Sequence, residues 1–417
     1  MLLFLAGGHK WGKIVYHKMD SFQRPLKICV VTTTRADYGL LHRLLWAMER
    51  EPEIELRLVA SGTHLLPSFG MTASEIEADG LSIDAKIPIV DHENNSEVRT
   101  AQIMAKAMER FADYFQKKYP DMLVVLGDRY EVFAVSAVAA VARIPIAHIH
   151  GGETTEGILD EAFRHCITKM SYLHFTACEA YRRRVIQLGE APERVFNVGA
   201  LGVENALHTD FVSLDELCDF LQFPLGEKPY AVVTFHPVTL ESNTAIEQMS
   251  ELAEAMTHRT DLQFLVTKSN ADTGGEAINR FWDNFARTNP HCYVVASLGA
   301  RRYLSALKYA SFVLGNSSSG IVEVPAFGIP TINIGDRQRG RMQAESIINC
   351  EPVQDKIAQA INTALSQEFR MIAAKAANPF GNGETSKKIC RVIMEQFRFG
   401  NVDLKKKFYD LNFSTGE

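Results

Sequence analysis

Residues 26–51, LKICVVTTTRADYGLLHRLLWAMERE, contain the pattern that decides the fold class. From Leu26 to Thr32 the run is apolar and β-branched with little interruption, which is typical of a strand buried on both faces of a parallel sheet. The next apolar residues recur at helical spacing, and they are Leu40, Leu41, Leu44, Leu45 and Met48. The segment therefore predicts a strand, a loop and a helix in succession.

The same alternation continues along most of the chain. Further apolar strands are predicted in IELRLVASG (54–62), PDMLVVLGD (120–128) and IPIAHIH (144–150), and a second series begins near Pro229 with YAVVTFHP (230–237). Alternating strands and helices are typical of α/β domains with parallel sheets. Because 417 residues exceed what one hydrophobic core usually organises, we predict two Rossmann-like domains.

The two series place the first domain at residues 26–205 and the second at residues 228–380, followed by a C-terminal segment, 381–417. Residues 1–25 are predicted to be a disordered leader. Their apolar run of about six residues is too short for a signal peptide or a membrane span. No later segment is apolar for long enough to cross a bilayer, so we expect no membrane association.

The composition excludes other classes of partner. The formal net charge is −6, whereas nucleic-acid binding favours a basic surface, so no nucleic-acid partner is expected. The seven cysteines are scattered and form no CxxC pair, which suits a reducing cytoplasm. The chain is thus predicted to be a cytoplasmic globular protein.

Polar, charged or glycine residues follow nearly every predicted strand. Ligands of open parallel sheets bind at the carboxyl ends of strands, and a cleft between two domains is the usual ligand site. The residues at these ends are Thr34, Arg35, Asp37, Tyr38, Gly62, His64, Gly127, Asp128, Arg129, His148, His150, Gly151, Gly152 and Glu153, and then His236, Pro237, Lys268, Ser269, Asn270, Gly315, Asn316, Ser317, Ser318, Ser319, Gly335, Asp336 and Arg337. Turns favour the same residue types, so each cluster alone is weak evidence. The whole set predicts a polar ligand between the domains.

The stretch GNSSSGIVEVPAFG (315–328) is the clearest of these strand ends. A loop of small residues opens a helix, where backbone N–H groups and serine hydroxyls can bind the phosphate of a nucleotide. The simpler alternative is that Ser317 to Ser319 only cap the helix. Glu323, one turn further on, suits the hydroxyls of a ribose. No GxxxxGK[ST] or GxGxxG motif occurs at these strand ends, which argues against P-loop and dinucleotide-binding folds.

The stretch HIHGGETTEGILDEAFRH (148–165) places three histidines and four acidic residues just after a predicted strand. It is either a solvated loop followed by an amphipathic helix or an acid/base site. Asp128 is similarly either a structural ion-pair partner or a carboxylate that moves a proton. His236 is either packed or in contact with a phosphate or leaving group. The spacing fits no zinc pattern, so no metal is expected.

Nine motifs occur in order between about residues 27 and 343. They are TTTRADYGLL, SGTHL, GDRYEVFA, HIHGGE, DEAFRHCITKMSYLHF, FHPVT, SNADTG, GNSSSGIVEVPAFG and INIGDRQRGR. Together they resemble the hydrolysing UDP-N-acetylglucosamine 2-epimerases of sialic acid biosynthesis, and the bacterial NeuC-type enzymes in particular.

The resemblance implies a GT-B fold, in which two Rossmann-like domains with parallel sheets face a central cleft. A C-terminal helix, here within 381–417, packs back on the first domain in this family. The implied reaction converts UDP-N-acetylglucosamine (UDP-GlcNAc) and water to N-acetylmannosamine and UDP, by elimination to 2-acetamidoglucal and then hydration. The resemblance also implies no cofactor, a UDP-sugar partner, and a homodimer or homotetramer.

Carried over by motif, the family's site falls on both halves of the chain. The nucleotide side comprises Arg35, His236, Asn270, Ser317, Ser318, Glu323 (on the ribose) and Arg337, and the sugar side comprises His64, Asp128, Arg129, Glu153 and Asp160. The resemblance leaves open whether Asp128 or Asp160 removes the C2 proton. His150 stands where related epimerases carry a glutamate, so it either transfers a proton or orients Glu153.

Four other functions remain compatible with these motifs. The same reaction could act on UDP-2,4-diacetamido-trideoxyhexose, on the route to legionaminic acid. A non-hydrolysing UDP-GlcNAc 2-epimerase and a GT-B glycosyltransferase would use the same nucleotide site. A non-catalytic UDP-sugar sensor would need the binding residues alone.

Overall fold

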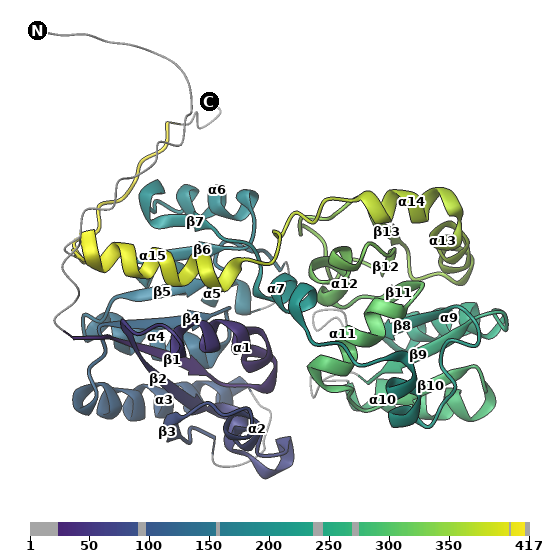
Figure 1. Cartoon of the computed structure of the whole chain (residues 1–417), viewed down its shortest axis with the longest axis horizontal. Coiled ribbons are helices and arrows are strands. Elements are labelled where there is room, and N and C mark those ends of the chain that lie inside the picture. Colours follow the sequence, from purple (N-terminus) through teal and green to yellow (C-terminus); the bar gives the residue numbers. More distant parts are fainter. Residues whose placement is uncertain are drawn as a thin grey trace, which may run out of the picture.

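The computed structural model describes residues 24–90, 97–155, 159–236, 245–268, 275–399 and 402–412. These residues form two α/β units side by side, each built on one parallel sheet (Figure 1). The first sheet has seven strands in the order β3-β2-β1-β4-β5-β6-β7, and the second has six in the order β10-β9-β8-β11-β12-β13. The predicted fold class, two parallel-sheet α/β domains of GT-B type, is confirmed.

The first unit begins at the strand predicted from the opening motif. Its strands are β1 (Leu26–Thr32), β2 (Ile54–Ser61), β3 (Ile83–Ile87), β4 (Met122–Leu126), β5 (Ile146–Ile149), β6 (Leu173–Thr176) and β7 (Val195–Asn197). Its helices are α1 (Arg35–Glu49), α2 (Ala73–Ala78), α3 (Glu97–Lys117), α4 (Tyr130–Val141), α5 (Asp160–Met170), α6 (Glu179–Gln187) and α7 (Leu201–His208), with 3-10 turns η1 (Gly62–Leu65), η2 (Pro67–Phe69) and η3 (Pro192–Arg194).

The second unit follows α8 (Leu214–Leu221). Its strands are β8 (Tyr230–Thr234), β9 (Gln263–Thr267), β10 (Cys292–Val295), β11 (Phe312–Gly315), β12 (Thr331–Ile334) and β13 (Ile347–Cys350). Its helices are α9 (Ala245–Thr257), α10 (Gly275–Thr288), α11 (Gly299–Tyr309), α12 (Ser318–Val322), α13 (Gln354–Leu365) and α14 (Gln367–Lys375), with the 3-10 turn η4 (Val324–Phe327), and the chain returns through α15 (Thr385–Phe399).

The strand order reverses at one point in each sheet, and these points position the site. In the first sheet β1 pairs with both β2 and β4, so the loops after β1 and β4 leave the sheet next to each other. In the second sheet β8 pairs with both β9 and β11, which brings the loops after β8 and β11 together. Crevices at such switch points are the usual ligand sites of open α/β sheets.

Strand β1 is buried on both faces, as its apolar run predicts. Ile28 and Val30 face a core shared with α1, whereas Cys29 and Val31 face a second core built with α3 and α4. A continuous apolar run rather than an alternating one is required because neither face of this strand meets solvent.

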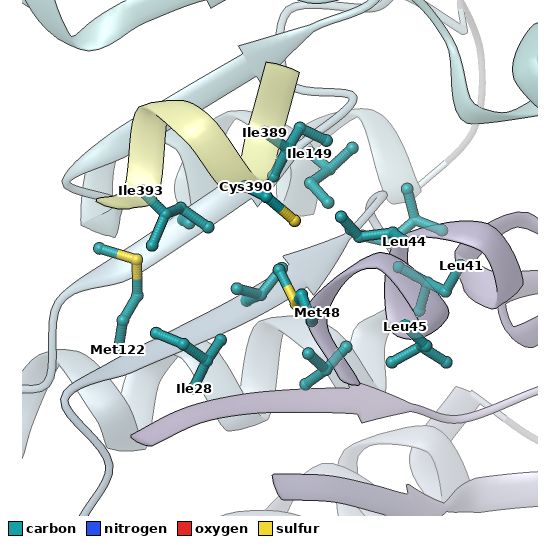
Figure 2. Packing of buried hydrophobic residues seen from close by; sticks show 14 of the residues in the cluster. Ile28, Leu41, Leu44, Leu45, Met48, Met122, Ile149, Ile389, Cys390 and Ile393 are labelled. Carbon is teal, nitrogen blue, oxygen red and sulfur yellow. The ribbon is translucent and has the colours of Figure 1, made fainter. Parts of the chain in front are cut away.

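Helix α15 packs against the first unit, next to α1 (Figure 1). Ile389, Cys390 and Ile393 enter the same core as Ile28 and Met48 (Figure 2). The domain boundaries 26–205, 228–380 and 381–417 remain predictions, and the predicted leader lies outside the described residues except for its last two. No helix within the described residues is long and apolar enough to cross a membrane.

A buried carboxylate anchors the segment after α15 to the first unit. The Glu190 side chain is 2% exposed and accepts hydrogen bonds from Lys169 (2.6 Å) and Lys406 (2.7 Å), and it also pairs with His174 (3.1 Å). Burial alone would raise the pKa of Glu190, but these contacts outweigh burial and lower it to about 2. Lys406 also donates to the carbonyl oxygen of Ser171 (2.7 Å), so it ties the C-terminal segment to the end of α5.

We expect Glu190 to contribute to the acid stability of the first unit. Its pKa is lower in the folded chain than the ordinary 4.5, so its stabilisation is present above pH 4.5 and is lost as the pH falls towards 2. The lost contribution is about 3 kcal/mol. Urea unfolding of Glu190→Gln should therefore depend less on pH than the wild type over this interval. The exposed Glu227→Gln is the matched control, and an equal change in both variants would contradict the expectation.

Candidate active site

Two glycine-containing loops carry the acidic residues of the first unit. Gly127 after β4 and Gly152 after β5 have positive φ angles of 77° and 76°. A Cβ on Gly152 would overlap the carbonyl oxygen of Tyr181, so only glycine fits at this position. His148 joins the two loops, because its Nε2 lies 2.7 Å from the carbonyl oxygen of Gly127. Asp128 and Glu153 are thereby held at neighbouring strand ends.

Arg164 on α5 organises these loops. Its side chain is 2% exposed and pairs with the carboxylates of Asp128 and Glu161. It also donates hydrogen bonds to the carbonyl oxygen of Glu153 and the hydroxyl of Thr155, both at 3.1 Å. A buried guanidinium is stable only when its charge and N–H groups are satisfied, and here two carboxylates and two further oxygens satisfy them.

Asp160, at the start of α5, has an unusual environment for a carboxylate. Burial and the negative charge of Asp128 raise its pKa to about 6, despite the opposing charges of Arg129 and Arg164. Two carboxyl groups that influence each other in this way are typical of acid/base sites. Asp160 can therefore hold a proton near neutral pH while Asp128 is paired with Arg164.

His150, on the loop after β5, has a strained backbone conformation, with φ of 66°. Its Nδ1 is 3.5 Å from Glu153 Oε1, and its buried Nε2 has no hydrogen-bond partner among the described residues. Burial lowers the pKa of His150 although Glu153 acts against the shift. The ring is thus neutral near pH 7, with one nitrogen available to a ligand.

In the second unit, hydrogen bonds between His236 and Asn316 join the loops that follow β8 and β11. The His236 N–H donates to Asn316 Oδ1 (2.7 Å), and Asn316 Nδ2 donates to the His236 carbonyl oxygen (2.8 Å). Arg337 donates to the Asn316 carbonyl oxygen at 3.2 Å. Burial, assisted by the charge of Arg337, lowers the pKa of His236 to about 4. A neutral imidazole beside a guanidinium suits an anionic ligand.

The loop before α12 contains the serines and Glu323. Ser317 caps the helix, since its hydroxyl accepts from the Ser319 N–H at 3.3 Å, and Ser318 is exposed at the first position. The five-residue helix provides only a small dipole, so an anion here depends mainly on the N–H and hydroxyl groups. Glu323 lies against the Cα of Gly202 from the first unit. Burial raises the pKa of Glu323 to about 7.

Two arginine side chains extend from one unit to residues of the other unit. Arg35 pairs with Glu75 (3.1 Å), and its Nη2 lies 3.4 Å from where a Cβ on Gly299 of α11 would stand. Arg341, in the turn between β12 and β13, reaches Glu153 of the first unit at 3.5 Å. Of the predicted site residues, Arg35, Glu153 and Glu323 therefore lie at contacts between the two units.

Comparison with known proteins identifies the family. The family profile described as UDP-N-acetylglucosamine 2-epimerase matches residues 46–394. The chain belongs to this family.

Relatives of this epimerase span nearly its whole length. "Polysialic acid biosynthesis protein P7" of Escherichia coli is 39% identical, with 92% of this chain and 97% of that protein covered. "GDP/UDP-N,N'-diacetylbacillosamine 2-epimerase (hydrolyzing)" of Campylobacter jejuni is 38% identical, covering 92% and 99%. The crystal structure of a UDP-GlcNAc 2-epimerase from Neisseria meningitidis bound to UDP-GlcNAc shares the fold, with a TM-score of 0.75, 15% identity, and 89% and 100% coverage.

Two of the residues predicted for the sugar side of this epimerase are engaged elsewhere. His64 is fully buried between the hydroxyls of Thr32 (3.0 Å) and Thr72 (2.7 Å), and burial lowers its pKa to about 4. Arg129 forms a bidentate pair with buried Glu131, at 3.1 and 2.8 Å. Their contact with a substrate remains a prediction. Asn270 lies outside the described residues.

Arg164 and Arg341 are functional candidates that the sequence pattern does not identify. Arg164 lies three positions after Glu161, and this i,i+3 spacing on a helix was the available signal. Arg341 lies in INIGDRQRGR among other arginines, and its partner Glu153 is far away in the sequence, so no local pattern distinguishes it. No group of metal-binding side chains occurs within the described residues.

We predict that Asp128→Asn lowers the pKa of Asp160 below 6. The substitution removes the negative charge that disfavours ionisation of Asp160, while burial remains. Carbon-13 NMR titration of labelled aspartate side chains would measure the change. Asp336→Asn, in an exposed turn of the second unit, is the control. An unchanged pKa of Asp160 in Asp128→Asn would show that the charge of Asp128 does not contribute to it.

Proposed function

We propose that this chain is a hydrolysing UDP-sugar 2-epimerase that converts UDP-GlcNAc and water to N-acetylmannosamine and UDP. The observation that carries the proposal is a cluster of acids in the first unit, where burial and the charge of Asp128 raise the pKa of Asp160 to about 6 and where Arg341 of the second unit reaches Glu153. Family membership supports an epimerase, and the names of relatives from Campylobacter and Legionella support the hydrolysing type.

The reaction requires a base for the C2 proton and stabilisation of the departing diphosphate. We assign the base to Asp160, because a group with a pKa near the working pH both accepts and returns a proton effectively. As the C2–H bond breaks, a C1–C2 double bond forms, the C1–O bond breaks, and its electron pair leaves with UDP. Burial and the charge of Asp128 keep the pKa of Asp160 high, and Asp128 remains paired with Arg164.

Hydration of the 2-acetamidoglucal completes the reaction. A water oxygen bonds to C1 while C2 receives a proton on the face opposite to the one that lost it. His150 and Glu153 are the candidates for this second proton transfer, since they lie together on the loop after β5. A neutral imidazole with a free ring nitrogen can accept the water proton.

The second unit is proposed to hold UDP. Arg337 and His236 would face the diphosphate together with Ser317, Ser318 and Arg35, in a preorganised arrangement that favours the charge developing on the leaving group. Glu323 would bind the ribose hydroxyls. The hydrogen bonds between His236 and Asn316 support this role because they fix the loop before any ligand arrives.

The sugar substrate has one specific alternative. The Campylobacter and Legionella relatives are named for UDP-N,N'-diacetylbacillosamine, whereas the Escherichia coli relative is named for polysialic acid biosynthesis. Turnover of UDP-GlcNAc and of the UDP-diacetamido-trideoxyhexose, measured side by side, would decide between them.

We also propose that the enzyme is a cytoplasmic homo-oligomer. A groove between α3 and α4 is lined by apolar residues that include Met108, Phe115 and Val138, and Val141 at its edge is 87% exposed. Exposed apolar surface of this kind is typical of interfaces. Light scattering should show a dimer or tetramer that dissociates in Val141→Glu, and a monomeric wild type would contradict the proposal.

We predict that UDP-GlcNAc yields free N-acetylmannosamine and UDP without any acceptor. Proton NMR of the reaction in D₂O should show deuterium at C2 of the released sugar, because the proton lost in the elimination is replaced from solvent. Intact UDP-N-acetylmannosamine would instead indicate a non-hydrolysing epimerase. Turnover only with a second sugar would indicate a glycosyltransferase.

We predict that Asp128→Asn leaves UDP binding nearly intact and lowers kcat about 100-fold or more, because the proposed base Asp160 loses a charge that raises its pKa and Arg164 loses a partner, so acid/base function is impaired. Calorimetry with UDP and a coupled UDP-release assay would measure the two effects. His236→Ala is the complementary variant, which should weaken UDP binding or raise KM. Wild-type turnover in Asp128→Asn would remove Asp128 from the mechanism.

A further inference from the structure

The turn between β12 and β13 of the second unit lies on the loop after β5 of the first unit. Arg341 Nη1 is 3.5 Å from Glu153 Oε2, and its Nη2 donates to Thr155 Oγ1 at 3.4 Å. The next residue, Met342, donates its backbone N–H to the hydroxyl of Tyr181 at 3.3 Å. Three contacts from two consecutive residues thus join this turn to the acid-bearing side of the first unit.

Both charged groups of this contact are largely removed from solvent. The side chains of Arg341 and Glu153 are 13% and 12% exposed. Desolvating either charge alone is costly, so each favours the position in which it meets the other. Their separation exceeds the roughly 2.8 Å of a charge-assisted hydrogen bond, so a small further approach of the units would strengthen the contact.

Glu153 connects Arg341 to His150, one of the proposed reacting groups. One carboxylate oxygen faces Arg341, whereas the other lies 3.5 Å from His150 Nδ1. Thr155 connects the same turn to Arg164, which donates to its hydroxyl at 3.1 Å and holds Asp128. Arg341 is therefore connected to His150 through Glu153. It is connected to Asp128 through Thr155 and Arg164.

We propose that Arg341 is a positioning residue that sets the orientation of Glu153, and through it of His150, only when the two units are together. This role rests on the proposed hydrolysing epimerase activity. Arg341 also acts on Glu323, the expected ribose ligand, through its charge. It thereby links the nucleotide side of the junction to the acid/base side, and the site is complete only with both units in contact.

The proposal predicts a specific change in charge at His150. The groups that act on His150 are Glu153 on its own loop, Arg341, Asp128, Arg164 and, from β5, His148. Arg341 disfavours the imidazolium directly and also competes for Glu153. When Arg341 is replaced by a neutral residue, Glu153 stabilises the protonated ring of His150 more strongly, so the pKa of His150 rises. A smaller fraction of His150 is then neutral at low pH.

The test compares Arg341→Met, Arg341→Lys, Glu153→Gln and the double variant, with Arg339→Met as the control from an exposed position of the same turn. Arg341→Met should lower kcat about 10- to 100-fold with a much smaller change in UDP affinity, since misplaced reacting groups mainly cost rate and Arg341 acts on Glu323 only through its charge. The acidic limb of its pH–rate profile should move to higher pH. Arg341→Lys should recover part of the rate, and the double variant should be no slower than the slower single variant.

Hydrogen exchange separates this proposal from the proposed reaction. In the protein without substrate, Arg341→Met should speed amide exchange in both the loop 151–155 and the turn 335–342, whereas Arg339→Met should not. Additive losses in the double variant, an unmoved pH profile or unchanged exchange would overturn the positioning role. The wild type could lack UDP-sugar turnover while Arg341→Met still speeds amide exchange in both the loop and the turn. This result would overturn the proposed reaction but would leave the contact between the units supported.

Discussion

The buried guanidinium of Arg164 is the interaction on which the sugar side of the junction depends. One planar group holds Asp128 from the loop after β4 and both Glu153 and Thr155 from the loop after β5. Three segments that are separate in sequence acquire a fixed geometry because a buried charge tolerates no loss of its partners. An acid/base reaction needs this precision, since proton transfer requires each group within hydrogen-bond reach of the reacting atom.

Burial then divides the ionisable groups by function. The same desolvation that raises the pKa of Asp160 to about 6 and of Glu323 to about 7 lowers the pKa of His236 to about 4. Glu190 behaves oppositely, because two lysines and a histidine compensate for its burial. A carboxylate whose partners outweigh its burial stabilises the fold, whereas one whose partners do not outweigh it can exchange a proton near neutral pH. The difference between structural and reactive acids in this chain is therefore a difference in partners.

In the proposed function, the two units separate nucleotide binding from proton transfer. The second sheet contributes groups suited to an anionic nucleotide, and the first contributes the acids. Their cooperation depends on side chains that cross the junction, as Arg341 does to Glu153 and Glu323 does to Gly202. Such contacts need both units, so the proposed reaction depends on groups from each.

The amino-acid pattern was sufficient for the fold class and for much of the candidate site. Buried strands such as β1 are apolar without interruption, and chemistry placed at the ends of parallel strands is visible as polar residues after each apolar run. The roles of individual side chains were not visible in this way. His64 stands at a strand end yet is enclosed by Thr32 and Thr72, whereas Arg164 reads as an ordinary helix residue yet organises the loops. Hydrophobic periodicity depends only on neighbouring residues along the chain, so the sequence alone specifies the helices and strands and where they end. Partners such as Arg341 and Glu153 meet only through folding, and burial and pairing, which decide charge and reactivity, exist only in the tertiary structure.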